Sequence, residues 1–108
     1  MKEVTVQELK SLFDSNVDIQ LIDVREIFEH ETANLGGKLI PMGEVENSVN
    51  EFDRHRQVIV YCRSGARSGR AIQWLEQNHS FDNLYNLKGG ILAWAEQIDN
   101  SISVEIIV

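Results

Sequence analysis

The sequence is poor in two residue types that would shape its architecture, since its 108 residues include one cysteine and one proline. A single cysteine excludes an internal disulfide and a cysteine-rich metal site, and it suits a reducing compartment. Pro41 is isolated, and no low-complexity tract or internal repeat indicates a linker. We therefore expect one domain spanning residues 1–108.

Long apolar runs are also missing from the sequence. No segment approaches the roughly 18 consecutive apolar residues of a membrane-spanning helix. Residues 1–5 lack the apolar core of a secretion signal. These features predict a cytoplasmic protein with no membrane contact.

Positive charge is scarce, with ten Lys and Arg against seventeen Asp and Glu and a net charge of −7. Such an acidic balance argues against a nucleic acid or an anionic membrane as a partner. The apolar content of 43% is sufficient for one hydrophobic core.

The one cysteine, Cys62, follows an apolar and β-branched run at residues 58–61, which predicts a buried strand. Residues 68–79 predict an amphipathic helix. The small residues between them allow backbone N–H groups to converge on one point, and Arg63 and Arg67 add positive charge. Both effects favour the thiolate. The pattern predicts a nucleophilic Cys62, against the alternative of a small buried hydrophobic residue.

Residues 62–68 resemble the active-site loop of single-domain rhodaneses, which are sulfurtransferases that carry a persulfide on one cysteine. Residues 21–26 resemble the end of the family's first conserved strand, and residues 87–94 resemble its C-terminal L-x-G-G-x-x-x-W motif. The resemblance implies an α/β, rhodanese-like, three-layer domain with a mainly parallel central sheet of about five strands flanked by helices. The alternation of strand and helix patterns agrees with this expectation.

The candidate site residues follow from two observations. The turn after Cys62 combines converging N–H groups with arginines, which suits an anion, and the same segment carries the family resemblance. Cys62 is predicted to be catalytic, and the substrate-binding residues are predicted to be Arg63, Ser64, Gly65, Ala66, Arg67 and Ser68. Asp23 and Arg25 are expected to support the loop, because carboxyl ends of parallel strands surround the binding crevice. The alternative for Asp23 is the N-cap of a short helix. No cofactor and no metal are predicted.

Several other residues are interpreted as structural. The usual histidine of the family's G-H-I-x-G-A stretch is replaced by Asn34. His30, His55 and His79 are interpreted as solvated surface residues, because none lies near a nucleophile in the sequence. Residues 89–90 are two glycines that match no phosphate-binding pattern. We expect them to let the backbone pass close to the Cys62 loop.

The remaining pattern predicts further elements on both sides of the candidate loop. A capping box at Thr5 and Glu8 predicts the start of a first helix. The other expected elements are a strand at residues 19–24, a short helix near residues 25–30, a short strand at 39–40, a helix at 42–52, a strand at 83–87 and a final helix after residue 90. The apolar tail, residues 103–108, is expected to add an edge strand, to pack on the body or to meet a partner.

Two reactions use a cysteine surrounded by backbone N–H groups. In sulfur transfer, thiosulfate or a protein persulfide donates sulfur to the cysteine, and cyanide or a thiol accepts it. A cysteine phosphatase or arsenate reductase instead needs an arginine six residues after the cysteine, where this chain has Ser68. Residues 63–67 also contain no carboxylate to protonate a leaving alkoxide. The loop therefore favours a thiosulfate sulfurtransferase.

A different class is a module for protein interaction or sulfur relay that serves an adenylating enzyme or a cysteine desulfurase. Residues 39–44 resemble rhodanese domains that are appended to adenylating enzymes. An intact loop around Cys62 argues against interaction as the sole role. A protein sulfur donor or acceptor is the partner that this alternative implies.

Overall fold

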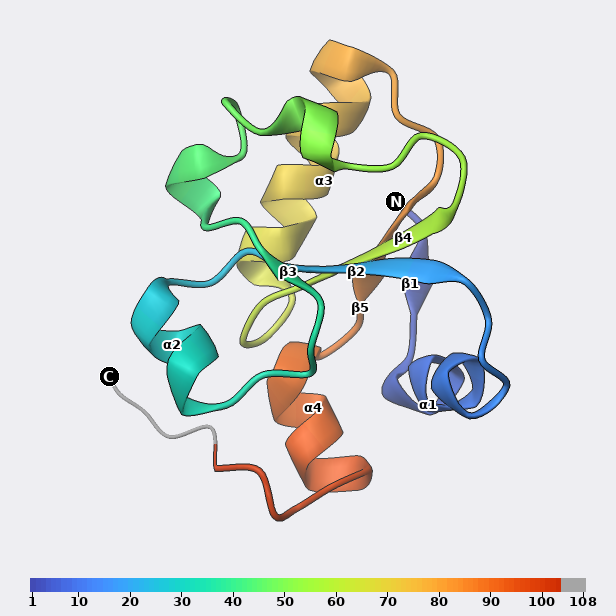
Figure 1. The fold of residues 1–108 in the computed structure, drawn as a ribbon, viewed down its shortest axis with the longest axis vertical. Helices are drawn as coiled ribbons and strands as arrows, with labels where there is room; N and C mark the ends of the chain where they lie inside the picture. Colours follow the sequence, from blue (N-terminus) through green and yellow to red (C-terminus); the bar gives the residue numbers. More distant parts are fainter. Residues whose placement is uncertain (104–108) are drawn as a thin grey trace.

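The computed structural model describes residues 1–103 and shows a parallel sheet with helices on both faces (Figure 1). Within these residues, five strands lie in the order β1-β5-β4-β2-β3, and every neighbouring pair is parallel. The strands are β1 (Glu3–Val4), β2 (Ile19–Asp23), β3 (Lys38–Leu39), β4 (Gln57–Tyr61) and β5 (Leu84–Leu87). The helices are α1 (Val6–Asp14), α2 (Ile27–Thr32), α3 (Ala66–His79) and α4 (Gly90–Gln97). The predicted α/β architecture is confirmed.

The central strand β4 contributes side chains to two separate cores. Val58 and Val60 pack with residues of α3, whereas Ile59 and Tyr61 pack with residues of α1 and α4. All four side chains are fully buried. Successive residues of a strand point to opposite faces, so a strand covered on both sides is apolar throughout.

The first helix begins as the sequence predicts. The Thr5 hydroxyl accepts a hydrogen bond from the Glu8 N–H at 3.0 Å, and the Glu8 carboxylate accepts one from the Thr5 N–H at 2.7 Å. This reciprocal capping box satisfies two N–H groups that the helix start leaves free. α1 then buries Val6 and Leu9 against the sheet.

The predicted helix at residues 42–52 is wrong. Two short 3₁₀ helices, Met42–Glu44 and Val49–Glu51, occupy this segment. The intervening residues include Asn47 and Ser48, which are residue types that favour turns over helix interiors. The segment instead places Val45 and Phe52 in the core on the α3 side. β1 was not expected either, because two residues are too few to form a pattern.

The ends of β2 and β4 lie side by side because Asp23 pairs with Tyr61 in the register of the two strands. The Val24 N–H also donates to the Tyr61 carbonyl at 3.0 Å. The segments that leave these strands therefore begin next to each other.

Two further expectations concern other parts of the chain. Residues 104–108 of the apolar tail lie outside the described residues. Within residues 1–103, each helix is too short or too polar to cross a membrane.

Candidate functional site

Cys62 follows β4 directly and lies beneath the loop that leads into α3. The residue is 1% exposed. Its Sγ accepts hydrogen bonds from the N–H of Gly65 at 3.1 Å and from the N–H of Ser68 at 3.4 Å. The Ser68 hydroxyl oxygen also lies 3.4 Å from Sγ. The small-residue turn therefore brings polar hydrogens together around one sulfur atom.

This environment lowers the pKa of the Cys62 thiol below its ordinary value. Burial is the largest effect and raises the pKa, because it disfavours the charged form. Hydrogen bonds from the Ser68 hydroxyl and from the N–H groups of Ser68, Gly65 and Ser64 together outweigh it. A thiolate is the nucleophilic form of cysteine, so the geometry suits a reactive thiol.

The loop conformation depends on Gly65, which adopts a φ of 103° as the N-cap of α3. Residues with a Cβ rarely adopt this left-handed conformation, whereas glycine adopts it freely. The chain can then turn sharply enough for α3 to begin at Ala66, two residues earlier than the sequence predicts.

The start of α4 packs against the backbone of the Cys62 loop. The N–H groups of Ile91 and Leu92 donate to the carbonyls of Cys62 and Arg63, at 3.0 Å and 3.1 Å. A Cβ at Gly90 would collide with both of these carbonyl groups. The predicted close passage of residues 89–90 is confirmed, and it satisfies N–H groups of a helix start.

Asn86 of β5 links two parts of the loop from behind. Its Nδ2 donates to the Gly65 carbonyl at 3.0 Å, and its Oδ1 accepts from the Ser68 hydroxyl at 2.5 Å. The sequence alone did not predict this contact. The signal was a polar residue inside a predicted buried strand, because a buried amide requires hydrogen-bond partners.

The arginines of the loop take different positions. Arg67 makes two hydrogen bonds to the Glu29 carboxylate of α2, at 2.8 Å and 2.9 Å. This pairing raises the pKa of Arg67 and lowers that of Glu29. Arg63 is exposed beside the exposed Ser64. Arg63 is therefore available to an incoming anion, whereas Arg67 ties the loop to α2.

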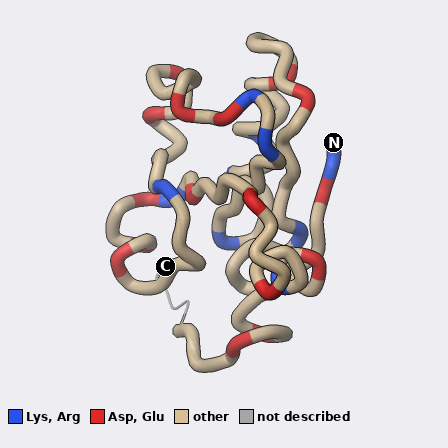
Figure 2. Tube along the Cα trace, turned by 45° about the vertical axis from the view of Figure 1, so that its right-hand side comes forward, with Lys and Arg blue, Asp and Glu red and all other residues tan. Residues whose placement is uncertain are grey.

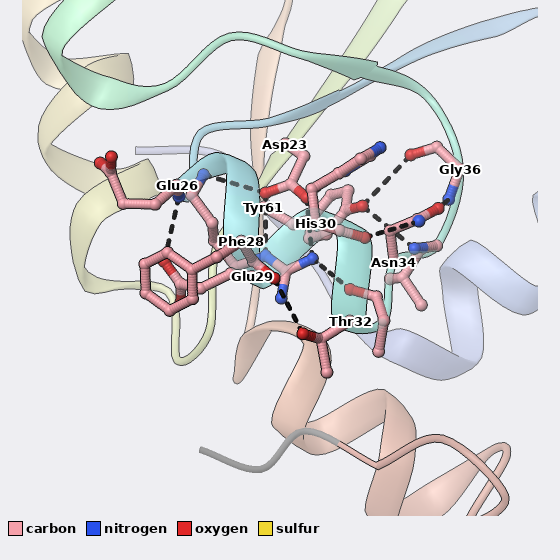
Figure 3. A network of polar contacts seen from close by, with 12 residues as sticks. Asp23, Glu26, Phe28, Glu29, His30, Thr32, Asn34, Gly36 and Tyr61 are labelled. Atoms are coloured by element: carbon pink, nitrogen blue, oxygen red, sulfur yellow. Dashed lines mark hydrogen bonds and ion pairs between the residues drawn. The ribbon is translucent and has the colours of Figure 1, made fainter. Parts of the chain in front are cut away.

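Asp23 and Arg25 form a buried ion pair beside this region, and Figure 3 shows Asp23 close to His30. Asp23 accepts from the Arg25 backbone N–H at 2.9 Å and from its guanidinium at 2.8 and 2.9 Å. The alternative interpretation of Asp23 as a helix N-cap is wrong, because Glu26 caps α2 in a box with Glu29. The pair stands where β2 ends, next to the end of β4, which Cys62 follows directly.

His30 was interpreted as a solvated surface residue, and this interpretation is wrong. Its Nδ1 lies 2.8 Å from the Asp23 carboxylate, and its side chain is 23% exposed. His30 follows Asp23 by seven positions, and the first turn of α2 brings it back over the end of β2. Sequence spacing across a loop and a helix start did not predict this contact.

The Tyr61 hydroxyl fastens the turn after α2. It accepts from the Leu35 N–H at 3.0 Å and donates to the Gly36 carbonyl at 3.2 Å (Figure 3). Burial raises the pKa of this phenol, so the hydroxyl keeps its proton. Tyr61 precedes Cys62, and its anchoring therefore fixes the strand end from which the candidate nucleophile projects.

Comparison with known proteins identifies the family. The family model of the rhodanese-like domain matches residues 5–97. The chain belongs to the rhodanese-like domain family. Some relatives of the chain carry the word sulfurtransferase in their names.

Two curated relatives match this rhodanese-like domain over most of its length. YqhL of Bacillus subtilis is 38% identical over 99 residues, which cover 91% of this chain and 75% of the relative. A protein of Allochromatium vinosum named "Sulfurtransferase" is 33% identical over 96 residues, which cover 88% of this chain and 89% of that protein. Two other relatives are longer, and the chain spans 50% and 36% of them.

A solved rhodanese-like domain protein from Staphylococcus aureus has the same fold. It superposes with a TM-score of 0.81 at 29% identity, covering 98% of this chain and 100% of that one. The expected rhodanese-like fold is therefore confirmed.

Charge is unevenly distributed over this rhodanese-like domain. Asp and Glu recur along the whole trace, whereas Lys and Arg form short separate stretches (Figure 2).

Within residues 1–103, no group of three His, Cys, Asp or Glu side chains is arranged to hold a metal ion. His55 is exposed, and His79 packs against the Trp74 ring at 5.1 Å between centroids.

Proposed function

We propose that this rhodanese-like domain transfers sulfane sulfur through a persulfide on Cys62. The observation that carries the proposal is the set of hydrogen bonds to Sγ from the N–H groups of Gly65 and Ser68 and from the Ser68 hydroxyl. They favour a thiolate at the end of a central strand, and they also suit a terminal sulfur that carries negative charge in the persulfide.

The proposed reaction has two displacements at sulfur. The Cys62 thiolate attacks the outer sulfur of thiosulfate, a new S–S bond forms, and sulfite leaves with the electron pair of the broken bond. With a protein persulfide as donor, the leaving group is that protein's thiolate. Cyanide or a thiolate acceptor then attacks the outer sulfur, and the electron pair of the Sγ–S bond returns to Cys62.

The residues of the loop have separate roles in this scheme. Ser64, Gly65 and Ser68 stabilise charge on the sulfur through their N–H groups. Arg63 and the exposed Ala66 border the approach to the loop, with Arg63 attracting an anionic donor. Arg67 holds the loop against α2 through Glu29, and the Asp23–Arg25 pair braces the neighbouring strand end. The reaction needs no cofactor, since the leaving groups are already stable anions.

The phosphatase and arsenate-reductase alternatives have less support. Their loop requires an arginine at the position of Ser68, whose hydroxyl instead lies 3.4 Å from Sγ. The neighbouring Arg67 is occupied by the Glu29 carboxylate. A sulfur-relay role with a protein donor or acceptor is compatible with the proposed chemistry, because it changes only the molecule that delivers sulfur.

Intact mass spectrometry tests the proposal. The purified protein is incubated with thiosulfate or with glutathione persulfide, and then with cyanide. We expect a gain of one sulfur atom that cyanide removes as thiocyanate, and no gain in Cys62→Ser. If neither donor changes the wild-type mass, Cys62 is not a sulfur carrier. A gain from glutathione persulfide alone would restrict the function to persulfide donors.

A further inference from the structure

Asn86 is a buried amide behind the Cys62 loop, and it is 5% exposed. Its Nδ2 faces the Gly65 carbonyl at 3.0 Å, and its Oδ1 faces the Ser68 hydroxyl at 2.5 Å. A carbonyl can only accept a hydrogen bond, so the amide NH₂ must point to Gly65. The amide oxygen is therefore fixed toward Ser68, and it can bond to the Ser68 hydroxyl only when that hydroxyl donates its proton to it.

The Ser68 hydroxyl has one proton and two neighbouring acceptors. Its oxygen lies 2.5 Å from Asn86 Oδ1 and 3.4 Å from Cys62 Sγ. When the proton points to Asn86, a lone pair of the hydroxyl faces the sulfur, which suits a neutral S–H. When the proton points to the sulfur, it stabilises the thiolate but leaves the buried amide oxygen without a donor.

We propose that Asn86 is a positioning residue that controls the ionisation of Cys62 by competing with its sulfur for the single Ser68 hydroxyl proton. Asn86 acts through Ser68 and does not touch the sulfur itself. While the Ser68 proton points to Asn86, it cannot stabilise the thiolate. Asn86 therefore offsets part of the stabilisation that the loop N–H groups give to the thiolate.

The consequence for catalysis rests on the proposed function. When an acceptor breaks the Sγ–S bond, the electron pair returns to Sγ, and the Ser68 proton can turn toward the new thiolate. When Cys62 carries sulfur, Sγ is bonded to a second sulfur and is a weaker acceptor, so the proton turns back to Asn86. The Asn86 amide thus accepts the hydrogen bond of the Ser68 hydroxyl during the half of the cycle in which Cys62 carries sulfur.

Other charged groups stand on the segments around Cys62, and any contribution they make must be held constant. They lie on the loop, on α2, at the end of β2 and between β5 and α4. They are Arg63 and Arg67, Glu29 with His30, the Asp23–Arg25 pair and the exposed Lys88. Substitutions at Asn86 and Ser68 leave all of these side chains in place.

The test measures the pKa of Cys62 from the ultraviolet absorbance of its thiolate, with Cys62→Ser as the blank. Asn86→Leu removes the competing acceptor, and we expect the pKa to fall by about 1 unit, the size of one hydrogen bond to a charged group. Asn86→Asp keeps an acceptor toward Ser68 and adds negative charge, so it should raise the pKa. If Asn86→Leu does not fold, Asn86→Ala takes its place.

The decisive arm repeats the substitution in Ser68→Ala. Without the hydroxyl there is no proton to compete for, so Asn86→Leu should then leave the pKa of Cys62 unchanged. Asn83→Leu is a matched control, because the Asn83 amide also donates to backbone carbonyls, those of Asp53 and Arg56, but lies where β5 begins. It should lower thermal stability without shifting the pKa.

Three results would overturn the inference: an unchanged or raised pKa in Asn86→Leu, the same fall in the Ser68→Ala background, or an equal fall in Asn83→Leu. The absorbance titration requires no sulfur donor. Failure of the proposed sulfur transfer would therefore appear as the absence of a mass gain, whatever the titration shows.

Discussion

Gly90 occupies the most restricted backbone position against the Cys62 loop. Its φ is 62°, and any Cβ would meet the carbonyls of Cys62 and Arg63. These carbonyls belong to backbone that is also held by α4 N–H groups, so neither partner can move independently. A side chain at this residue would therefore meet both an unfavourable backbone conformation and a steric clash.

We therefore predict that Gly90→Ala lowers the free energy of unfolding by at least about 2 kcal/mol and reduces sulfur loading of Cys62. The loop must shift to make room for the methyl group, which displaces the N–H groups around the sulfur. Urea denaturation and the mass assay with thiosulfate measure the two effects.

Gly43→Ala is the matched control, because an added Cβ there meets no atom within 4 Å. Its stability and its sulfur loading should equal those of the wild type. Wild-type behaviour of Gly90→Ala in both assays would show that α4 does not constrain the loop.

Single residues show where sequence reasoning succeeded. The placement of Cys62 at a strand-to-helix turn followed from the change of hydrophobic period on either side of it. The contacts of Asn86 and Tyr61 did not follow, because each joins segments that only the sheet brings together. A sequence pattern describes one element at a time, whereas these contacts depend on the order of strands.

The element that connects most of the site is α2. It is only six residues long and buries none of them. Its attachment is polar: Glu29 binds Arg67 of α3, and His30 contacts Asp23 of β2. Helix position therefore depends on charged groups instead of an apolar face, and acid should weaken it.

The pKa of Glu29 determines the direction in which stability changes with pH. Its pKa in the folded protein lies below the ordinary 4.5, mainly because Arg67 stabilises the carboxylate. The resulting stabilisation is complete above about pH 4.5 and is lost as the pH falls through the lowered value. We predict that Glu29→Gln is less stable than the wild type at pH 7 and that the difference shrinks in acid.

Urea denaturation of both proteins between about pH 7 and pH 3 measures this convergence. Glu51→Gln is the control, because the Lys38–Glu51 pair is about half exposed on both sides and should contribute little. A stability difference for Glu29→Gln that stays constant with pH would contradict a role for the ion pair.

The segment at residues 42–52 shows why its prediction as one helix is wrong. The apolar spacing of Val45, Val49 and Phe52 fits a helical face, and only Val45 and Phe52 become fully buried. Two 3₁₀ helices reach the same core with a polar break between them. Spacing alone cannot distinguish one helix from two short turns when polar residues can bond to local backbone.

At the scale of the whole molecule, the charge of −7 opposes an anionic donor such as thiosulfate. Arg67 is paired with Glu29, so the exposed Arg63 is the loop arginine that can attract such a donor. A donor protein that docks on the domain brings its sulfur by contact and depends less on this attraction.

We predict that Arg63→Glu raises the KM for thiosulfate strongly, with less effect on transfer from a protein persulfide. For the wild type, higher salt should also raise the thiosulfate KM, since screening acts over a Debye length of about 8 Å at physiological ionic strength. Steady-state kinetics at low and high salt with both donors measures these effects.

Lys10→Glu is the control, because it makes the same change in net charge on the exposed side of α1. Equal losses in the two Glu variants would assign the effect to total charge and not to Arg63. Equal loss with both donors in Arg63→Glu would instead indicate that Arg63 shapes the loop.

The strand order also has a consequence for how the chain folds. Glu3 pairs with Asn86, and β4 is flanked by β2 and β5, so these three strand pairings join distant parts of the sequence. Such non-local pairing is slow to form. The hydrogen bonds of Asn86 to the Cys62 loop form only after β5 has docked. A folding intermediate that lacks β5 would thus lack the Asn86 contact that holds Gly65, so the N–H groups around the sulfur would reach their final arrangement only late in folding.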